Sequence, residues 1–83
     1  MSNLIGHKVI GTKQTLRALK NGEVKAVYIA RDAEERIVND VQKTAKEGNV
    51  QVVFVPTMVE LGKAFGIDVG AATAALLKVT DEG

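Results

Sequence analysis

The sequence predicts a single α/β domain in which helices cover both faces of a β-sheet. Short β-branched runs alternate along the chain with segments whose apolar residues recur at helical spacing. Glycine, asparagine, aspartate or proline lies at the junctions between these segments, and no linker, repeat or low-complexity stretch interrupts them. The chain has 83 residues, 46% of them hydrophobic and 25% charged, which suits one small folded domain spanning residues 1–83.

Two runs are predicted to be buried strands because they are short, β-branched and apolar on both faces. They are residues 24–30 (VKAVYIA) and residues 49–55 (NVQVVFV). Residues 71–79 form a third candidate strand, and Val9 with Ile10 suits a short edge strand.

The first helix is predicted to begin at Thr12, which can cap its N-terminus. Asn21 and Gly22 can end it in a left-handed turn. Leu16 and Leu19 then face inward, toward the sheet.

Asp32 can cap a second helix that Gly48 ends. Its first turn carries two acids that the helix dipole favours, Glu34 and Glu35. Its apolar residues recur at helical spacing and form one stripe: Ile37, Val38, Val41 and Ala45. Thr57 and Glu60 form a capping-box pattern directly after Pro56, which opens a third helix that Gly66 closes.

The composition excludes several classes of function. Without cysteine there is no disulfide, thiolate metal site or thiol nucleophile, and no metal or cofactor motif is present. His7 is the only histidine, and the acids at the start of the second helix are explained by that position, so we expect no enzyme activity. The sequence shows no secretory signal and no apolar run of membrane-spanning length, so we expect a cytoplasmic, soluble monomer.

Charge is distributed unevenly, although the net charge is only +1. Between Lys8 and Lys25 there are five basic residues and one acid, which gives this segment a charge of +4. The rest of the chain sums to −3. Since a ligand responds to local charge, this distribution permits an anionic partner.

The segment GTKQTLRALKNG, residues 11–22, concentrates this charge on one edge of the first helix. Lys13, Arg17 and Lys20 fall in a narrow arc at helical spacing, with Gln14 and Asn21 beside them. The helix N-terminus adds free backbone N–H groups, and Gly11 allows a ligand to approach closely. We predict that this edge binds an anion because no acid balances it; the alternative is an ordinary solvated helix face.

A second segment, LGKAFGIDVGAA at residues 61–72, predicts a tight turn between the third helix and the last strand. If Ile67 and Val69 face outward in this turn, they can pack on an unstacked base or a ribose. The alternative is that they fold back into the core.

Together, the G-T-K-Q-T-L-R and L-G-K-A-F-G-I-D-V-G-A-A runs resemble the kink-turn RNA-binding ribosomal protein family of the L7Ae type. The chain looks most similar to the small bacterial members of the YbxF type, and the resemblance covers about residues 9–77. It implies a three-layer α/β/α sandwich around a small mixed four-stranded sheet. It also implies binding to a kink-turn, an RNA duplex bent at a three-nucleotide bulge next to tandem sheared G·A pairs. The implied RNA is ribosomal RNA or a riboswitch, and the ribosome is a further implied partner.

The resemblance also assigns roles to residues. The first helix would meet guanine edges and phosphates at the G·A pairs, and the turn at residues 67–71 would cover the bulged nucleotide. The implied RNA-binding residues are Gly11, Thr12, Lys13, Gln14, Arg17, Lys20, Ile67, Asp68, Val69, Gly70 and Ala71.

One departure from the family is informative. Archaeal and eukaryotic members carry Asn-Glu where this chain has Lys13-Gln14. Gln14 can accept a hydrogen bond from guanine without the charge that strengthens the bond to Glu, while Lys13 adds attraction to phosphate. We therefore expect binding to depend more on salt. The other function that the basic edge allows is a protein-interaction module with an acidic partner.

Overall fold

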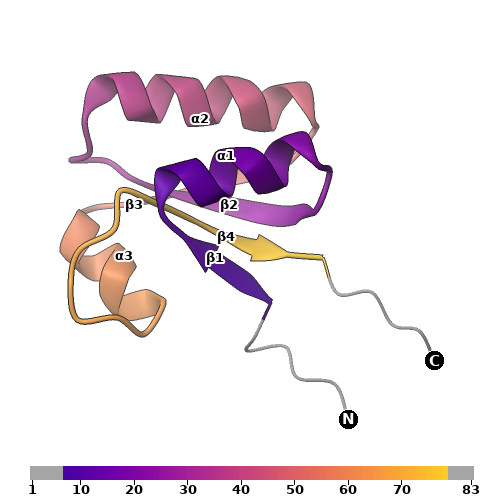
Figure 1. Ribbon diagram of the computed structural model, residues 1–83. Coiled ribbons are helices and arrows are strands. Elements are labelled where there is room, and N and C mark those ends of the chain that lie inside the picture. The colour runs from indigo at the N-terminus through magenta and orange to yellow at the C-terminus, as the bar shows by residue number, and fades with distance from the viewer. Residues whose placement is uncertain (1–6, 79–83) are drawn as a thin grey trace, which may run out of the picture.

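The computed structural model describes residues 7–78, which form a four-stranded sheet and three helices (Figure 1). In chain order the elements are β1 (Lys8–Ile10), α1 (Thr12–Lys20), β2 (Val24–Ala30), α2 (Glu35–Glu47), β3 (Gln51–Val55), α3 (Met58–Ala64) and β4 (Thr73–Leu77). The strand order is β1-β4-β2-β3. β2 and β3 are parallel, while β4 is antiparallel to both β1 and β2, so the sheet is mixed.

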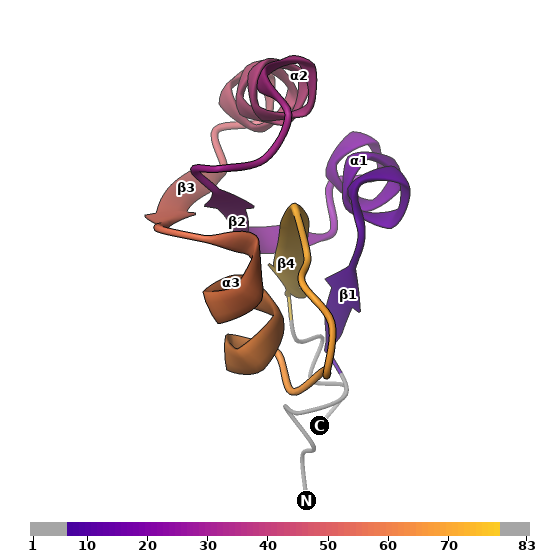
Figure 2. The same cartoon turned by 90° about the vertical axis from the view of Figure 1, so that its left-hand side faces the viewer.

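Helices cover both faces of the sheet, as predicted. Figure 2 shows α1 and α2 on one face and α3 on the other. On the first face, Val27, Ile29 and Val41 are completely buried in a shared apolar cluster. On the second, Leu61 of α3 and Phe65, the C-cap of that helix, pack with buried alanines of the sheet. The fold is thus the three-layer α/β/α sandwich that the resemblance implies.

The predictions of β1 and β2 are confirmed. β3 differs from its prediction in its first residue and its burial, and β4 is shorter than predicted. β3 begins at Gln51 rather than at residue 49, and it lies at the edge of the sheet, so its apolar residues are only half-buried. Its apolar sequence predicts burial, but only one neighbour, β2, pairs with it. β4 covers residues 73–77 of the predicted 71–79, and Val79 lies outside the described residues.

The predicted caps of α1 and α2 are wrong. Thr12 is the first residue of α1 and Gly11 is its N-cap; the Thr12 hydroxyl instead bonds to the hydroxyl of Thr73 at 3.2 Å. Asp32 lies too far before α2, which begins at Glu35 with Glu34 as N-cap. Both side chains could form local caps, but each has a long-range partner in the folded chain.

The predicted start of α3 is confirmed. The Thr57 hydroxyl accepts a hydrogen bond from the Glu60 N–H at 3.1 Å. Asp32 adds a second acceptor there, because its Oδ1 atom accepts the Met58 N–H at 2.8 Å. The N-terminus of α3 is therefore capped by one local and one distant side chain.

Candidate nucleic-acid interface

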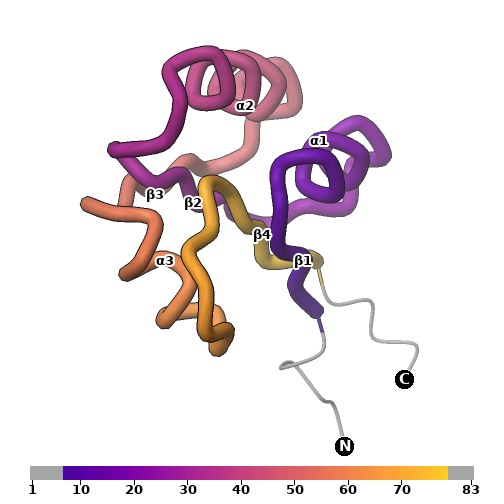
Figure 3. The backbone as a smooth tube through the Cα atoms, turned by 60° about the vertical axis from the view of Figure 1, so that its left-hand side comes forward, coloured from indigo at the N-terminus to yellow at the C-terminus, as the bar shows by residue number. Residues whose placement is uncertain are grey.

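The sheet topology brings the start of α1 next to the start of β4. β1 and β4 are antiparallel neighbours, so the residues that follow β1 lie beside those that precede β4. The Gly11 N–H donates to the Thr73 carbonyl at 2.8 Å, and the two threonine hydroxyls join Thr12 to Thr73. Residues 66–72, here called the α3–β4 loop, therefore end against the N-terminus of α1 (Figure 3).

α1 presents its polar edge to solvent. Lys13, Gln14, Arg17 and Lys20, here called the basic edge, are all exposed. The opposite face of the helix is buried through Thr15, Ala18 and Leu19, which fixes the rotation of α1 about its axis. A shallow groove runs beside the basic edge, and the described residues that line it include no acid: Lys13, Leu16, Arg17, Lys20 and Asn21.

The N-terminus of α1 is open to a ligand. No side chain among residues 7–78 caps it, and its first turn contains no acid, so its backbone N–H groups and positive dipole end are available. Gly11 has φ of +113°, a conformation that side chains rarely adopt, and a Cβ there would lie 3.5 Å from Gln14 Oε1. Gly11 thus permits the turn that leads from β1 into α1 and brings its amide to Thr73.

The α3–β4 loop is seated closely on α3. A Cβ at Gly62 would collide with the Val69 carbonyl oxygen, and one at Gly70 would lie 3.2 Å from Met58 Cβ. The Ala71 N–H donates to the Met58 carbonyl at 3.0 Å. These contacts hold the loop against one side of the helix, so its outward face has a defined shape.

Apolar residues of the loop point in different directions. Val69 is 68% exposed, whereas Ile67 is half-buried. Ile67 packs against the apolar cluster around Leu61 and Phe65, here called the α3 cluster. Ala71 is also buried, while Asp68 and Gly70 are exposed. The two alternatives for this turn therefore both occur: Ile67 folds back toward the core and Val69 faces outward.

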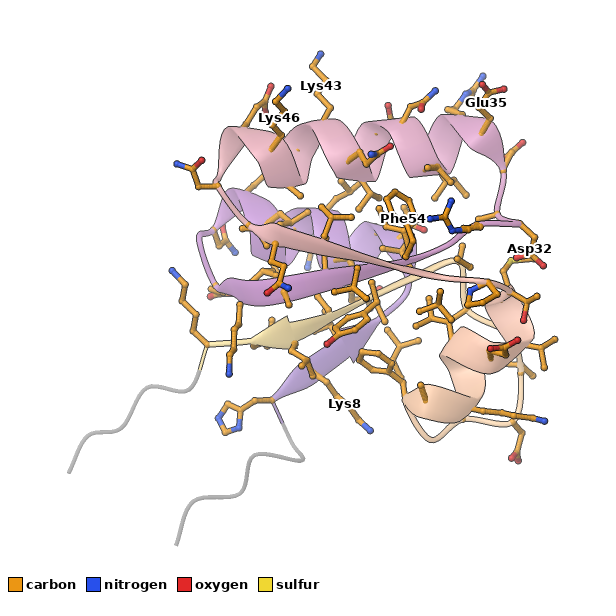
Figure 4. The ribbon with its side chains drawn as sticks, turned by 180° about the vertical axis from the view of Figure 1, so that it is seen from behind. Lys8, Asp32, Glu35, Lys43, Lys46 and Phe54 are labelled. Atoms are coloured by element: carbon orange, nitrogen blue, oxygen red, sulfur yellow. The ribbon has the colours of Figure 1, made fainter. Side chains whose placement is uncertain are left out.

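Two positioning contacts were missed by sequence reasoning. Lys8 Nζ donates to the Phe65 carbonyl at 2.8 Å and so binds the C-terminus of α3 to β1. Asp32 holds the other end of α3 through the Met58 N–H. Figure 4 shows Lys8 and Asp32 reaching opposite ends of that helix. No local pattern could have revealed either contact, since the partners are 57 and 26 residues apart.

The structure offers no metal site or membrane span within the described part of the chain. Residues 7–78 contain no group of three His, Cys, Asp or Glu side chains that could hold a metal ion. None of the helices formed by these residues is both long and apolar enough to cross a bilayer.

Comparisons with known proteins agree with the sequence resemblance. Residues 5–82 match the model of the ribosomal protein L7Ae/L30e/S12e/Gadd45 family. The chain is 57% identical over 70 residues to RNA-binding protein BH0128 of Halalkalibacterium halodurans, covering 84% of this chain and 85% of that one. It is 52% identical over 73 residues to RNA-binding protein YbxF of Geobacillus stearothermophilus, covering 88% and 89%.

Two longer proteins extend the comparison. Large ribosomal subunit protein eL8 of Halobacterium salinarum is 40% identical over 72 residues, covering 86% of this chain and 60% of eL8. The solved structure of the Giardia lamblia 15.5kD RNA binding protein superposes with a TM-score of 0.81 at 26% identity, covering 88% of this chain and 62% of the other. The chain thus spans less than two thirds of each of these two relatives.

Proposed function

Because the chain belongs to the ribosomal protein L7Ae/L30e/S12e/Gadd45 family, we propose that it is a non-enzymatic RNA-binding protein that recognises kink-turns. The observation that carries the proposal is the junction at Gly11 and Thr73, which joins the basic edge of α1 to the α3–β4 loop. The relatives named above support RNA as the partner. The protein would act as a monomer in the cytoplasm, on ribosomal RNA or a riboswitch.

The basic edge would read the tandem G·A pairs. Lys13, Gln14 and Arg17 would meet guanine edges and nearby phosphates, with Gly11 and Thr12 placing the N-terminus of α1 close to the RNA. Lys20 would contact phosphate only. Lys20 is assigned to phosphate because it lies in the last turn of α1, away from the N-terminus, and an ammonium on a flexible stem acts mainly as a point charge. Gln14 and Arg17 can hydrogen-bond to base edges.

The α3–β4 loop would cover the bulged nucleotide. Val69 supplies the apolar contact because it is the exposed large hydrophobic side chain of the loop. Asp68 and Gly70 flank it, while Ile67 and Ala71 would shape the loop from beneath. Since Tyr28 and Phe65 stack edge to face with ring centroids 5.4 Å apart, both rings are engaged in packing. The cover over the RNA would therefore be aliphatic.

Physical chemistry favours a kinked target over a regular duplex. A-form RNA has a deep, narrow major groove that side chains cannot read, so proteins select distorted or unpaired sites. A kink exposes base edges and brings two phosphate backbones together, where the cations of α1 can offset their repulsion. Gln14 accepts without a negative charge, so electrostatic attraction should supply a larger share of the affinity here.

The test is a titration with one kink-turn RNA and with a control in which Watson–Crick pairs replace the G·A pairs. We expect clear preference for the kink-turn, and affinity for both RNAs that falls steeply as salt rises. Equal affinity for the two RNAs would refute kink-turn recognition. Failure to bind either RNA would favour the other interpretation, a module that docks an acidic protein on the basic edge.

A further inference from the structure

The helical face of the molecule carries three neighbouring grooves that extend beyond the basic edge. The groove beside α1 shares Leu16 and Lys20 with a second groove between α1 and α2. The second shares Lys43 with a third groove between α2 and the edge strand β3. The three grooves together extend from α1, along both sides of α2, to the edge of the sheet.

Each of the three grooves is lined by at least one exposed cation. We call Lys13, Arg17, Lys20, Lys43 and Lys46 the cationic track. Two acids, Asp40 and Glu47, line only the middle groove. The third groove adds amides and no acid among its described lining residues: Gln42, Lys43, Lys46, Asn49, Val50, Gln51 and Val52. Cations together with amide side chains are groups that contact phosphates in nucleic-acid complexes.

α2 carries charges of both signs along its length, and Lys43 and Lys46 lie in its second half with one acid, Glu47. Figure 4 shows Glu35 near the start of the helix and Lys43 and Lys46 toward its end, both projecting away from the sheet. The helix dipole explains Lys46, which lies in the last turn. It does not explain why Lys43 stands beside Lys20 of the neighbouring helix, since that alignment depends on how α1 and α2 pack.

The dimensions of this face suit an RNA helix. α1 and α2 pack side by side in the same direction, because each follows one of two strands that are both antiparallel to β4 (Figure 1). Packed helices lie about 8–10 Å apart. With a rise of about 1.5 Å per residue, the track is on the order of 20 Å long, which is enough for several phosphates.

We propose that Lys43 and Lys46, at the α2 end of the cationic track, bind the phosphate backbone of an RNA helix that flanks the kink-turn. This proposal rests on the proposed function and extends it, because the protein would then contact RNA outside the G·A pairs and the bulge. The contact would be independent of sequence and would lengthen the RNA segment that the protein prefers. Continuity with the basic edge argues for RNA as the occupant.

The test compares kink-turn RNAs with short stems and with either stem extended, using the K43Q/K46Q variant. Glutamine removes each charge while keeping a good helix former at an exposed position. We expect about tenfold weaker binding to one extended RNA, less than about twofold change on the short RNA, and a salt slope smaller by about 1–2. K63Q is the matched control, because Lys63 is exposed on α3 across the sheet.

The outcomes distinguish failure of this proposal from failure of kink-turn recognition, on which it rests. If the wild type prefers the kink-turn but K43Q/K46Q binds both extended RNAs as the wild type does, the track is refuted and kink-turn recognition stands. Equal losses on short and extended RNAs also refute the track, since they would place these lysines at the kink. If the wild type shows no preference for the kink-turn, both proposals fail.

Discussion

The basic edge of α1 and the α3–β4 loop lie next to each other but depend on different levels of structure. The basic edge follows from helical spacing, with its buried opposite face setting the orientation. The loop depends on contacts with α3, on Lys8 from β1 and on Asp32 from the β2–α2 turn. Substitutions on the basic edge of α1 should therefore affect binding alone, whereas substitutions beneath the loop should change stability and binding together.

Gly62→Ala should have the largest effect, because the added methyl group would collide with the Val69 carbonyl. Such overpacking typically costs about 1–3 kcal/mol. We expect a lower free energy of unfolding in chemical denaturation, and weaker RNA binding because the loop must move.

Gly48→Ala is the matched control for that experiment. A Cβ there would lie 3.6 Å from Val50 Cγ2, an ordinary van der Waals contact, and the φ of −96° suits alanine. We expect a stability change within about 0.5 kcal/mol. A Gly62→Ala variant as stable and as active as this control would contradict the close seating of the loop.

Arg17→Ala should come next, with its effect on binding and not on folding. Loss of a base-edge contact costs roughly 1–3 kcal/mol of specific binding. Lys20→Ala should weaken binding to all RNAs similarly and lower the salt slope by about one. Affinities of both variants for kinked and unkinked RNA at several salt concentrations test this division. The same loss from both substitutions on both RNAs would overturn it.

The sequence predicts the local features of this protein well, but it does not predict which side chains bond to partners far away in the sequence. The alternation of elements and the Thr57 cap depend on residues that are close in the sequence, and the structure confirms them. Helices on both faces of the sheet follow from that alternation, while the mixed four-stranded sheet was implied by the family resemblance. Thr12 and Asp32 were predicted to cap α1 and α2 because capping residues are recognised by local position. Their partners, Thr73 and Met58, become neighbours only in the folded sheet.

In the candidate site, too, burial could be predicted where local spacing sets it and not where long-range packing sets it. The exposed basic edge could be predicted because helical period divides α1 into two faces. Ile67 and Val69 are equally apolar and only two residues apart, so sequence pattern could not decide which one faces solvent. The seating of the loop on Gly62 decides it.

Ile67→Asp and Val69→Asp should therefore behave differently. Ile67 packs with the α3 cluster, so a carboxylate there should lower the free energy of unfolding by about 1–3 kcal/mol. Val69 is 68% exposed, and its substitution should leave stability within about 0.5 kcal/mol. RNA affinity should fall in the Val69 variant, because a negative charge would face the bulged nucleotide. Thermal melts and RNA titrations check both; early melting of the Val69 variant would contradict the loop orientation.

Thr15→Val should have the smallest effect and the opposite sign. Thr15 lies on the buried face of α1 and is completely buried, and its hydroxyl has no hydrogen-bond partner among the described residues. A buried hydroxyl without a partner costs about 1–3 kcal/mol, so replacing it with a methyl group should raise the free energy of unfolding by about 0.5–1 kcal/mol.

Thr15→Ser is the informative counterpart, because it keeps the hydroxyl and removes the methyl group. It should lower stability by about 1 kcal/mol. Neither substitution should change RNA affinity, since Thr15 faces away from the basic edge. If Thr15→Val were destabilising instead, the hydroxyl must be bonded within the helix, and the buried face of α1 would hold its orientation partly through a polar contact. If Thr15→Val changed RNA affinity, the buried face and the basic edge of α1 would be coupled. That result would contradict the expectation that the basic edge determines binding independently of stability.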